Sequence, residues 1–284
     1  MTSLQSCPPT GEPVSAIDGK LARLDAELLR LGRVVVAFSG GVDSAFLAHR
    51  ALQVLGYRAA HAVTAVSPSL AGDEEADCSA LATEWGMRWT PVVTDEMARA
   101  AYRANDIDRC HHCKAELMDV VGPIAAGEGA VVVLGVNLDD LGDHRPGQAA
   151  AAAEGAQFPM VAAGLTKDDI RELSRRLGLR TWDKPAAACL ASRVPYGTEV
   201  SVGILSRVDR AETALKKLGL RELRVRHYDE TARLEVPLAD LDAVLRQREA
   251  VVAAVKSAGY RYVTLDLEGF RSGNLNDGRV LSNS

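Results

Sequence analysis

The sequence predicts an α/β fold: a doubly wound parallel sheet followed by a smaller C-terminal α+β region. Short apolar runs of strand length alternate with helical stretches over the first two thirds of the chain. Polar or glycine-rich residues follow several of these runs. Parallel sheets of this kind carry helices on both faces and bind ligands beyond the carboxyl ends of their strands. We therefore expect the functional residues to follow the strands.

The elements of the predicted sheet come in a regular order. Leucines at helical spacing predict a leading amphipathic helix over residues 18–31. The expected strands are apolar and end at polar or glycine residues: 33–38, 59–66, 88–93 and 130–136. The expected helices between them cover residues 45–55, 73–85 and about 113–126.

The pattern changes after Gly197, and we place a domain boundary near residue 198. The first domain is expected to cover 18–198, and residues 1–17 are expected to be a flexible tail. The second domain, 199–284, is expected to form a small α+β unit with an antiparallel sheet. Its expected elements are a helix at 202–218, strands at 222–226 and 233–236, a helix at about 238–257 and a strand at 261–267.

Composition narrows the class of protein. The 284 residues are 47% hydrophobic and 25% charged, the balance of a globular protein with a substantial core. No apolar run is long enough to cross a bilayer, and the first residues lack the pattern of a signal peptide. The net charge of −5 argues against a tightly bound nucleic acid. Five cysteines are too few for a disulfide scaffold, so we expect a cytoplasmic protein whose cysteines do chemistry or bind metal.

The strongest functional signal is the segment Ser-Gly-Gly-Val-Asp-Ser after the first expected strand. Gly40 and Gly41 let the backbone turn sharply and approach a ligand, and the amides at the next helix start attract an anion. Ser39 and Ser44 add hydroxyl donors, and Asp43 can orient the loop or hold Mg²⁺. The loop lacks the lysine of the ordinary P-loop, so it is a different motif. A glycine turn capped by Asp or Ser is the structural alternative.

The segment 39–44 resembles the pyrophosphate loop of the N-type ATP pyrophosphatases, which cleave ATP to AMP and pyrophosphate. Four further stretches are similar to one family of that group, the LarE family of ATP-dependent sulfur transferases in nickel-pincer nucleotide biosynthesis. They are DRCHHCK (108–114), GVNLDD (135–140), KPAAACLASR (184–193) and LDLEGFR (265–271). Together the matches span roughly residues 18–276, nearly the whole chain.

The resemblance implies an activity, a substrate and an assembly. It implies that ATP with Mg²⁺ adenylylates a carboxylate of pyridinium-3,5-biscarboxylic acid mononucleotide, and that this carboxylate then becomes a thiocarboxylate. The AMP group makes a poor acyl electrophile reactive, and a thiolate is a strong attacking group. The resemblance also implies a homohexamer.

Three cysteines carry the sulfur chemistry that the resemblance implies. Cys189 matches the family's sulfur-handling cysteine, and Lys184 and Arg193 would favour its thiolate if they come close in space. Family members that also hold a Cys-x-x-Cys pair, here Cys110 and Cys113, bind a 4Fe-4S cluster through three thiolates. One iron then stays open to carry sulfide. We therefore predict the cluster form.

Other interpretations of these cysteines are open. Cys189 could instead sacrifice its own sulfur and become dehydroalanine, which limits each polypeptide to one event. Zinc bound by the three cysteines with His111 or His112 is the competing metal site. A reversible disulfide between Cys110 and Cys113 comes next. Their position near a helix start is expected to lower the pKa of both thiols.

Further residues are expected to bind the nucleotide or the substrate. Gly135 is expected to let adenine approach the sheet. Asp140, with Asp139, is expected either to bind Mg²⁺ or a ribose hydroxyl or to cap a turn. Ser192 and Arg193 are expected to help bind the substrate or pyrophosphate.

The C-terminal domain offers a basic pair. Arg224 and Arg226 alternate along a strand and share one face, and the resemblance places a phosphate-binding pair here. The alternative is an exposed strand face on which they pair with Glu222 or Glu235. Three carboxyl or basic groups carry weaker expectations: Glu212 and Glu235 as metal or supporting carboxylates, and Arg145, in a family loop with Asp143 and Gly147, as a phosphate contact. Cys7 and Cys78 are assigned no role, and Cys78 is expected on a packed helix face.

Three other functions are compatible with a nucleotide-binding protein of this class. A tRNA thiolase also adenylylates its substrate and uses cysteine, but it should carry a basic surface or an added RNA-binding domain. Residues 199–284 hold 14 Lys and Arg against 13 Asp and Glu, and aromatic residues make up 5% of the chain, so no RNA surface is expected. An ammonia-using synthetase would not need Cys189. A nucleotide-sensing module would bind ATP without releasing pyrophosphate.

Overall fold

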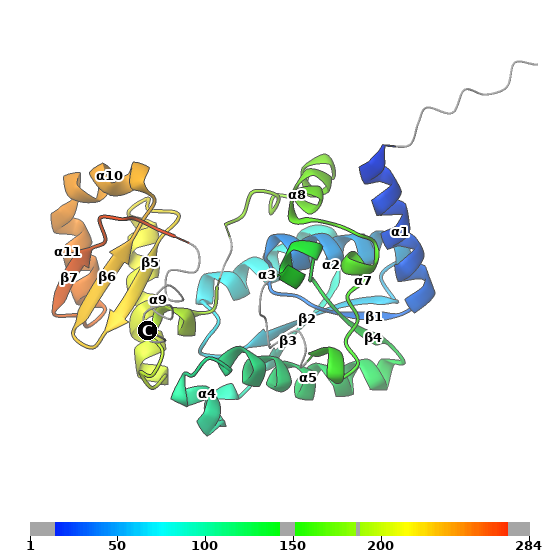
Figure 1. The fold of residues 1–284 in the computed structure, drawn as a ribbon, viewed down its shortest axis with the longest axis horizontal. Helices are drawn as coiled ribbons and strands as arrows, with labels where there is room; N and C mark the ends of the chain where they lie inside the picture. The colour runs from blue at the N-terminus through cyan, green and yellow to red at the C-terminus, as the bar shows by residue number, and fades with distance from the viewer. Residues whose placement is uncertain (1–14, 143–150, 186–187, 272–284) are drawn as a thin grey trace, which may run out of the picture.

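A four-stranded parallel sheet is the largest feature of the computed structural model, which describes residues 15–142, 151–185 and 188–271. Its strand order is β3-β2-β1-β4 (Figure 1). The strands are β1 (Val34–Ala37), β2 (Ala60–Val66), β3 (Arg88–Val93) and β4 (Val131–Leu134). Each lies within a predicted apolar run, so the predicted α/β class is confirmed.

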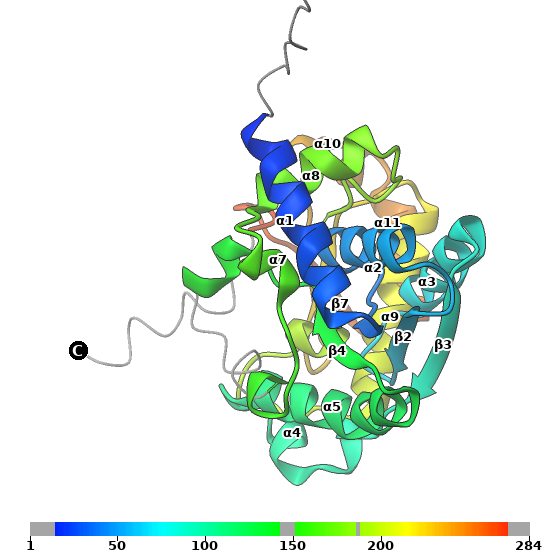
Figure 2. The same cartoon turned by 90° about the vertical axis from the view of Figure 1, so that its right-hand side faces the viewer.

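Helices cover both faces of this sheet because its strands are apolar on both sides. In β1, Val34 and Val36 belong to one core and Val35 to the other. Figure 2 shows α1 and α2 on one side of the sheet and α5 on the other. The helices of the first core are α1 (Ala16–Leu31), α2 (Val42–Leu55), α3 (Gly72–Trp85), α7 (Pro159–Ala162) and α8 (Lys167–Arg176); α5 (Arg109–Glu128) belongs to the second.

The strand order creates a topological switch point between β1 and β4. The chain moves outward from β1 to β2 and β3, and it then returns to place β4 on the other side of β1. Loops that follow two such strands diverge and leave a crevice at the carboxyl edge of the sheet. The segment 39–44 follows β1 and the segment 135–140 follows β4. Both sequence motifs therefore meet at this crevice.

The C-terminal part forms a second, three-stranded sheet of order β5-β6-β7. The predicted antiparallel sheet is wrong in one pairing: β5 and β6 are antiparallel, but β6 and β7 are parallel. A helical crossover between them brings β7 back in the same direction as β6. The elements are α9 (Val202–Lys217), β5 (Arg224–Tyr228), β6 (Thr231–Glu235), α10 (Leu241–Arg246), α11 (Arg248–Ser257) and β7 (Tyr262–Leu265).

The single helix predicted at about 238–257 is also wrong. A 3₁₀ turn, η4 (Leu238–Asp240), precedes α10, and Gln247 then separates α10 from α11 with a backbone outside the helical region. Apolar side chains of both helical pieces still enter one core with β5 and β6. Helical spacing of those side chains continues across the break, which is why the pattern alone did not reveal it.

A fourth apolar cluster lies where α4 (Ala100–Ala104), the 3₁₀ turn η3 (Leu190–Arg193) and α9 meet. It contains Tyr102 of α4, Leu190 and Ala191 of η3, and Leu205 and Val208 of α9. Figure 1 shows α9 between the two sheets. The domain boundary near residue 198 stays a prediction. In the described part of the chain, no helix has both the length and the apolar character needed to span a membrane.

Candidate functional site

The loop 39–44 closes on itself at the start of α2. The Ser44 hydroxyl accepts a hydrogen bond from the Ser39 backbone N–H at 3.2 Å and lies 3.1 Å from the Ser39 hydroxyl. Gly40 has a φ of +69°, which favours glycine. Among the described residues, no side chain caps the α2 N-terminus. Its outward amides are therefore available to an anion, as predicted for a phosphate loop.

Asp43 ties this loop to the turn after β4. Its carboxylate accepts a hydrogen bond from the Asn137 amide at 3.2 Å and forms a close ion pair with Lys167. The Asp140 carboxylate accepts a hydrogen bond from the Asn137 backbone N–H at 3.1 Å. Asp139 accepts one from the Lys167 backbone N–H at 2.7 Å. Asp140 thus caps this turn, the structural alternative of the sequence analysis, whereas Asp139 attaches the turn to the start of α8. The roles of Asn137 and Lys167 were not anticipated.

Gly135 has a packing role that the sequence did not reveal. A Cβ at this position would lie 2.7 Å from the Ser44 nitrogen and 3.0 Å from the Asp43 carbonyl carbon. The glycine therefore lets the loop after β1 pack directly on the end of β4. The expected approach of adenine to Gly135 stays a prediction.

Gly135→Ala is expected to destabilise the fold by about 1–3 kcal/mol, because the added methyl group meets backbone that cannot rotate away. Urea unfolding followed by circular dichroism measures this change. Gly122→Ala in α5 is the matched control, since nothing lies within 4 Å of its added Cβ. The control should gain up to about 1 kcal/mol from helix propensity. Equal stability of Gly135→Ala and wild type would contradict the close packing.

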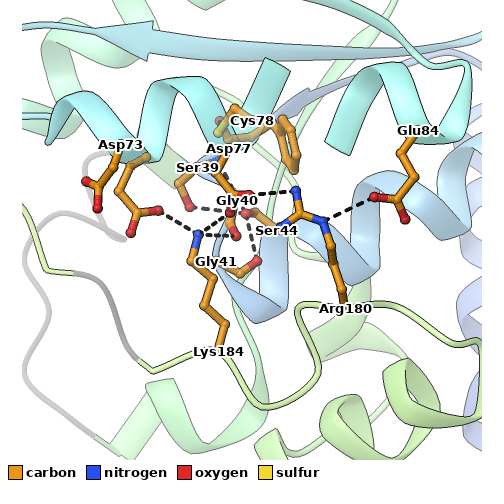
Figure 3. Close-up of polar contacts among 12 residues, drawn as sticks. Ser39, Gly40, Gly41, Ser44, Asp73, Asp77, Cys78, Glu84, Arg180 and Lys184 are labelled. Carbon is orange, nitrogen blue, oxygen red and sulfur yellow. Dashed lines mark hydrogen bonds and ion pairs between the residues drawn. The ribbon is translucent and has the colours of Figure 1, made fainter. Parts of the chain in front are cut away.

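Lys184 links the segment before Cys189 to the phosphate loop. Its ammonium donates to the Gly40 carbonyl at 3.1 Å and pairs with Glu74 and Asp77 of α3, each at 2.7 Å. Figure 3 shows Lys184 reaching the loop beside Asp77, with Arg180 on the far side of that carboxylate. Burial acts to lower the pKa of Lys184, but the two carboxylates outweigh it and raise that pKa. Lys184 is thus a cation at the loop, paired with α3 carboxylates.

Cys189 lies at the carboxyl edge of the same sheet. The next residue, Leu190, donates its backbone N–H to the carbonyl of Ser69, in the loop after β2, at 2.8 Å. Cys189 is exposed and follows Lys184 by five residues. A chain of that length spans at most about 18 Å. The exposed thiol is therefore confined to the region of the phosphate loop.

The three predicted cysteines share one neighbourhood. Cys110 and Cys113 lie in the first two turns of α5, and the four described cysteines are free thiols. Burial, and then the negative charge of Cys189, raise the pKa of Cys113 to about 12, with a smaller contribution from Cys110. The expected lowering is thus wrong for Cys113, because its packing against the Tyr102 cluster outweighs the helix dipole. Cys78, also buried, has its pKa raised to about 11, first by burial.

The arrangement of the described cysteines and histidines fits a site for a single metal ion poorly. In the described ranges, no three His, Cys, Asp or Glu side chains gather closely enough to hold one metal ion. His112 instead lies 3.2 Å from the Asp108 carboxylate, and its ring meets that of His111 edge to face. This arrangement does not favour the competing zinc site. Cys7, Asp143, Arg145 and Gly147 lie outside the described residues.

Arg109 and Asn105 hold the Cys189 segment, and neither was anticipated. Arg109 is 5% exposed and donates to the Ala191 carbonyl at 2.9 Å and to the Asn105 side chain. Burial acts to lower the pKa of Arg109, but the charges of Cys189 and then Cys110 outweigh it and raise that pKa. Asn105, fully buried with φ +57°, donates to the carbonyls of Pro195 at 2.8 Å and Thr198 at 2.9 Å.

The Arg193 guanidinium is engaged by the buried carboxylate of Glu212. Its guanidinium makes two hydrogen bonds to the Glu212 carboxylate, at 2.8 and 3.0 Å, and donates to the Ala188 carbonyl at 2.6 Å. It also donates to the Cys189 carbonyl at 3.3 Å and to the Ser192 hydroxyl at 3.0 Å. Glu212, for which a metal or supporting role was expected, is thus the buried counter-ion that attaches η3 to α9. Substrate binding by Ser192 and Arg193 stays a prediction.

Arg224 and Arg226 share a face as predicted, but that face is covered. Arg226 is 1% exposed, pairs with Glu235 at 2.8 Å and donates to the Ser192 carbonyl at 2.7 Å. The expected exposed face is therefore wrong, although the expected pairing with Glu235 is confirmed. Arg224 stacks on Phe270 at 4.6 Å and pairs with no carboxylate among the described residues. Burial, and then the charges of Arg193 and Arg226, lower the pKa of Arg224 to about 10.

Arg224 opens on a cavity of about 300 Å³ between α3, α9 and the start of β5. Basic and acidic side chains line it together with the ring of Phe270. The lining includes Glu74, Lys184, Arg193, Lys216 and Arg224. Because Lys184 also contacts the Gly40 carbonyl, this cavity and the phosphate loop are neighbours. Its size is at the lower end of small-molecule sites.

No family model matches the chain, but three curated proteins align with most of its length. An uncharacterized protein of Synechocystis is 44% identical over 269 residues, 94% of this chain and 99% of the relative. The pyridinium-3,5-bisthiocarboxylic acid mononucleotide synthase of Lactiplantibacillus plantarum is 38% identical over 259 residues, 91% of this chain and 94% of the relative. An uncharacterized protein of Methanocaldococcus jannaschii is 24% identical over 241 residues, 84% of this chain and 91% of the relative.

Alignments of this length include both sheets and the site between them. The synthase from Lactiplantibacillus plantarum matches the chain at an identity of 38% over nine tenths of both sequences. Such similarity extends beyond the shared phosphate loop of a superfamily. The chain therefore belongs to the family of pyridinium-3,5-bisthiocarboxylic acid mononucleotide synthases, the LarE family.

Proposed function

We propose that this protein is an ATP-dependent sulfur transferase that converts a carboxylate of a pyridinium mononucleotide into a thiocarboxylate. The observation that carries the proposal is the confinement of the exposed Cys189 to the region of an uncapped phosphate loop. The family relative, a thiocarboxylate mononucleotide synthase, names the matching product. Pyridinium-3,5-biscarboxylic acid mononucleotide is the proposed substrate, and ATP with Mg²⁺ is the proposed activating reagent.

The proposed reaction has two halves. In the first, a substrate carboxylate oxygen attacks the α-phosphorus of ATP, and pyrophosphate leaves into the loop 39–44. The amides at the start of α2 and the hydroxyls of Ser39 and Ser44 would bind its oxygens. In the second, sulfur attacks the acyl carbon of the adenylate, and AMP leaves. Lys184 contacts the loop from the segment that leads to Cys189.

A 4Fe-4S cluster is the proposed sulfur carrier. The thiolates of a cluster bind separate irons, so they need not converge as the ligands of one ion do. The donor set fits: two thiols one turn apart on α5 and a third on the facing loop influence one another's charge. Cys110, Cys113 and Cys189 would hold the cluster, which would supply an iron open to carry sulfide. The exposure of Cys189 also suits the sacrificial route, which the experiment below separates.

Anaerobically purified protein with ATP, Mg²⁺ and the dicarboxylate mononucleotide tests the proposal. We expect pyrophosphate release that depends on the mononucleotide, and a product whose mass shows sulfur in place of oxygen. Iron and labile sulfide in the protein, with several turnovers when sulfide is added, would identify the cluster route. One product per chain and dehydroalanine at position 189 would identify the sacrificial route. Pyrophosphate release without any carboxylate substrate would falsify the proposed chemistry.

Arg224 is the proposed contact of the mononucleotide phosphate, because it is buried among cations, has no carboxylate partner within the described ranges and opens on the cavity. Arg226 is less suited, since Glu235 already balances its charge. Arg224→Met is expected to raise the KM for the mononucleotide about tenfold or more, with a smaller change in kcat. Steady-state pyrophosphate release measures both constants. Arg246→Met, at an exposed position of α10, is the control, and an unchanged KM in Arg224→Met would reject the assignment.

A further inference from the structure

Arg109 is a buried cation without a carboxylate partner in the described ranges. It is 5% exposed, as deeply buried as Arg193 and nearly as deeply as Arg226. Those two arginines each face a buried glutamate, whereas Arg109 contacts neutral groups: it donates to two oxygens, and its guanidinium lies over the Tyr196 ring at 5.7 Å from the ring centroid. A buried charge is costly unless a partner balances it. The position of Arg109 therefore needs an explanation beyond packing.

Its position in the fold supplies one. Arg109 is the first residue of α5, directly before Cys110 and one turn before Cys113. Its Nη1 donates to the carbonyl of Ala191, two residues after Cys189, at 2.9 Å. One guanidinium thus joins the two segments that carry the three thiols. Arg109 and Ala191 are 82 residues apart in the sequence, so only the fold brings their two segments together.

The remaining donors of Arg109 are free to act on an anion. Its Nε and Nη2 make no hydrogen bond to a described residue, and neither nitrogen is fully buried. The groups that can present an anion to these donors include Cys110, the next residue in the chain, and Cys189, two residues before the contacted Ala191. Asn105 holds the same loop through three backbone carbonyls, so the loop does not depend on Arg109 alone.

We propose that Arg109 is the positioning residue of the sulfur site, which sets Cys189 against Cys110 and Cys113 and balances an anionic sulfur species held among them. Thiolate and hydrosulfide are the chemical class that this guanidinium would accept. The inference rests on the proposed function, because it assigns Arg109 to the sulfur-delivering half of that reaction. A purely structural arginine would support both halves equally.

The test compares Arg109→Gln and Arg109→Lys with wild type and with the control Arg103→Gln. Arg103 lies on the neighbouring α4, where it donates to the Met97 carbonyl at 2.7 Å. The first readout is the yield of disulfides from Cys189 to Cys110 or Cys113 under a mild thiol oxidant, measured by peptide mass spectrometry in metal-free protein. The second is iron and labile sulfide bound after anaerobic reconstitution. The third is thiocarboxylate formed per pyrophosphate released.

We expect Arg109→Gln to lower the disulfide yield, the iron retention and the product ratio by about 10–100-fold, as the loss of a supporting contact to a metal ligand does. Arg109→Lys should recover part of each, since it keeps the charge, and Arg103→Gln should match wild type. If either variant lowers pyrophosphate and thiocarboxylate in proportion, Arg109 is only structural and the inference is wrong. Wild-type values in Arg109→Gln would also overturn it. Failure of the proposed function is distinct, because wild type itself would then release no substrate-dependent pyrophosphate.

Discussion

Cys189→Ser is expected to abolish thiocarboxylate formation while pyrophosphate release with the mononucleotide continues. A serine hydroxyl is a poor ligand for iron and carries no sulfur, so both proposed routes of sulfur delivery are lost. The proposed adenylylation would use the phosphate loop, which the described part of the 184–189 segment contacts through Lys184. We expect a loss of product on the order of 10³-fold or more, as for removal of an essential nucleophile.

Mass spectrometry of the nucleotide product and a coupled pyrophosphate assay, run on the same sample, measure the two halves separately. Cys7→Ser makes the same thiol-to-hydroxyl change elsewhere in the chain and serves as the control. Product formed by Cys189→Ser at the wild-type rate would remove Cys189 from sulfur transfer. That outcome would favour the ammonia-using synthetase over the sulfur transferase as the function of this protein.

Glu235→Leu is expected to lower the free energy of unfolding by about 3–5 kcal/mol. Glu235 is completely buried and pairs with Arg226 at 2.8 Å and with Arg233 at 3.0 Å. Its removal would leave the buried Arg226 guanidinium uncompensated beside the cation Arg224. Repulsion between these two guanidiniums would add to the desolvation cost.

Urea unfolding followed by circular dichroism measures this loss. Glu249→Leu is the control, since Glu249 pairs with Arg248 on the surface, where both side chains are at least 71% exposed. That change should stay within about 0.5 kcal/mol. The double variant Arg226→Met with Glu235→Leu should be more stable than Glu235→Leu alone, because it removes the buried Arg226 charge together with its partner. A small effect of Glu235→Leu would mean that the Arg226–Glu235 pair is not shielded from water.

Local patterns account for what could be predicted from the sequence. The phosphate loop is a run of consecutive residues between an apolar strand and a helix, so its position follows from short-range pattern alone. The Cys-x-x-Cys pair is local in the same way. Arg224 and Arg226 share a face because strand side chains alternate, and this was also predictable.

Contacts between distant segments account for what could not be predicted. The face of Arg226 is covered by the Ser192 carbonyl, 34 residues away, so strand alternation could not reveal its burial. Lys184 pairs with Glu74, which is 110 residues away in the sequence, and no short-range pattern predicts that ion pair. Asn105 did leave a weak signal, because asparagine favours the left-handed backbone that ends a helix. Gly135 was singled out from the sequence, and the structure shows a further physical reason for a glycine there, the close approach of Ser44.

The Arg193–Glu212 pair has a mechanical consequence. It fastens the turn behind Cys189 to α9, and α9 in turn packs against the three-stranded sheet. A rigid displacement of that sheet would carry the thiol along with the cavity wall. Widening the cavity and displacing the Cys189 thiol would therefore be one movement, which couples the size of a bound ligand to the position of that thiol.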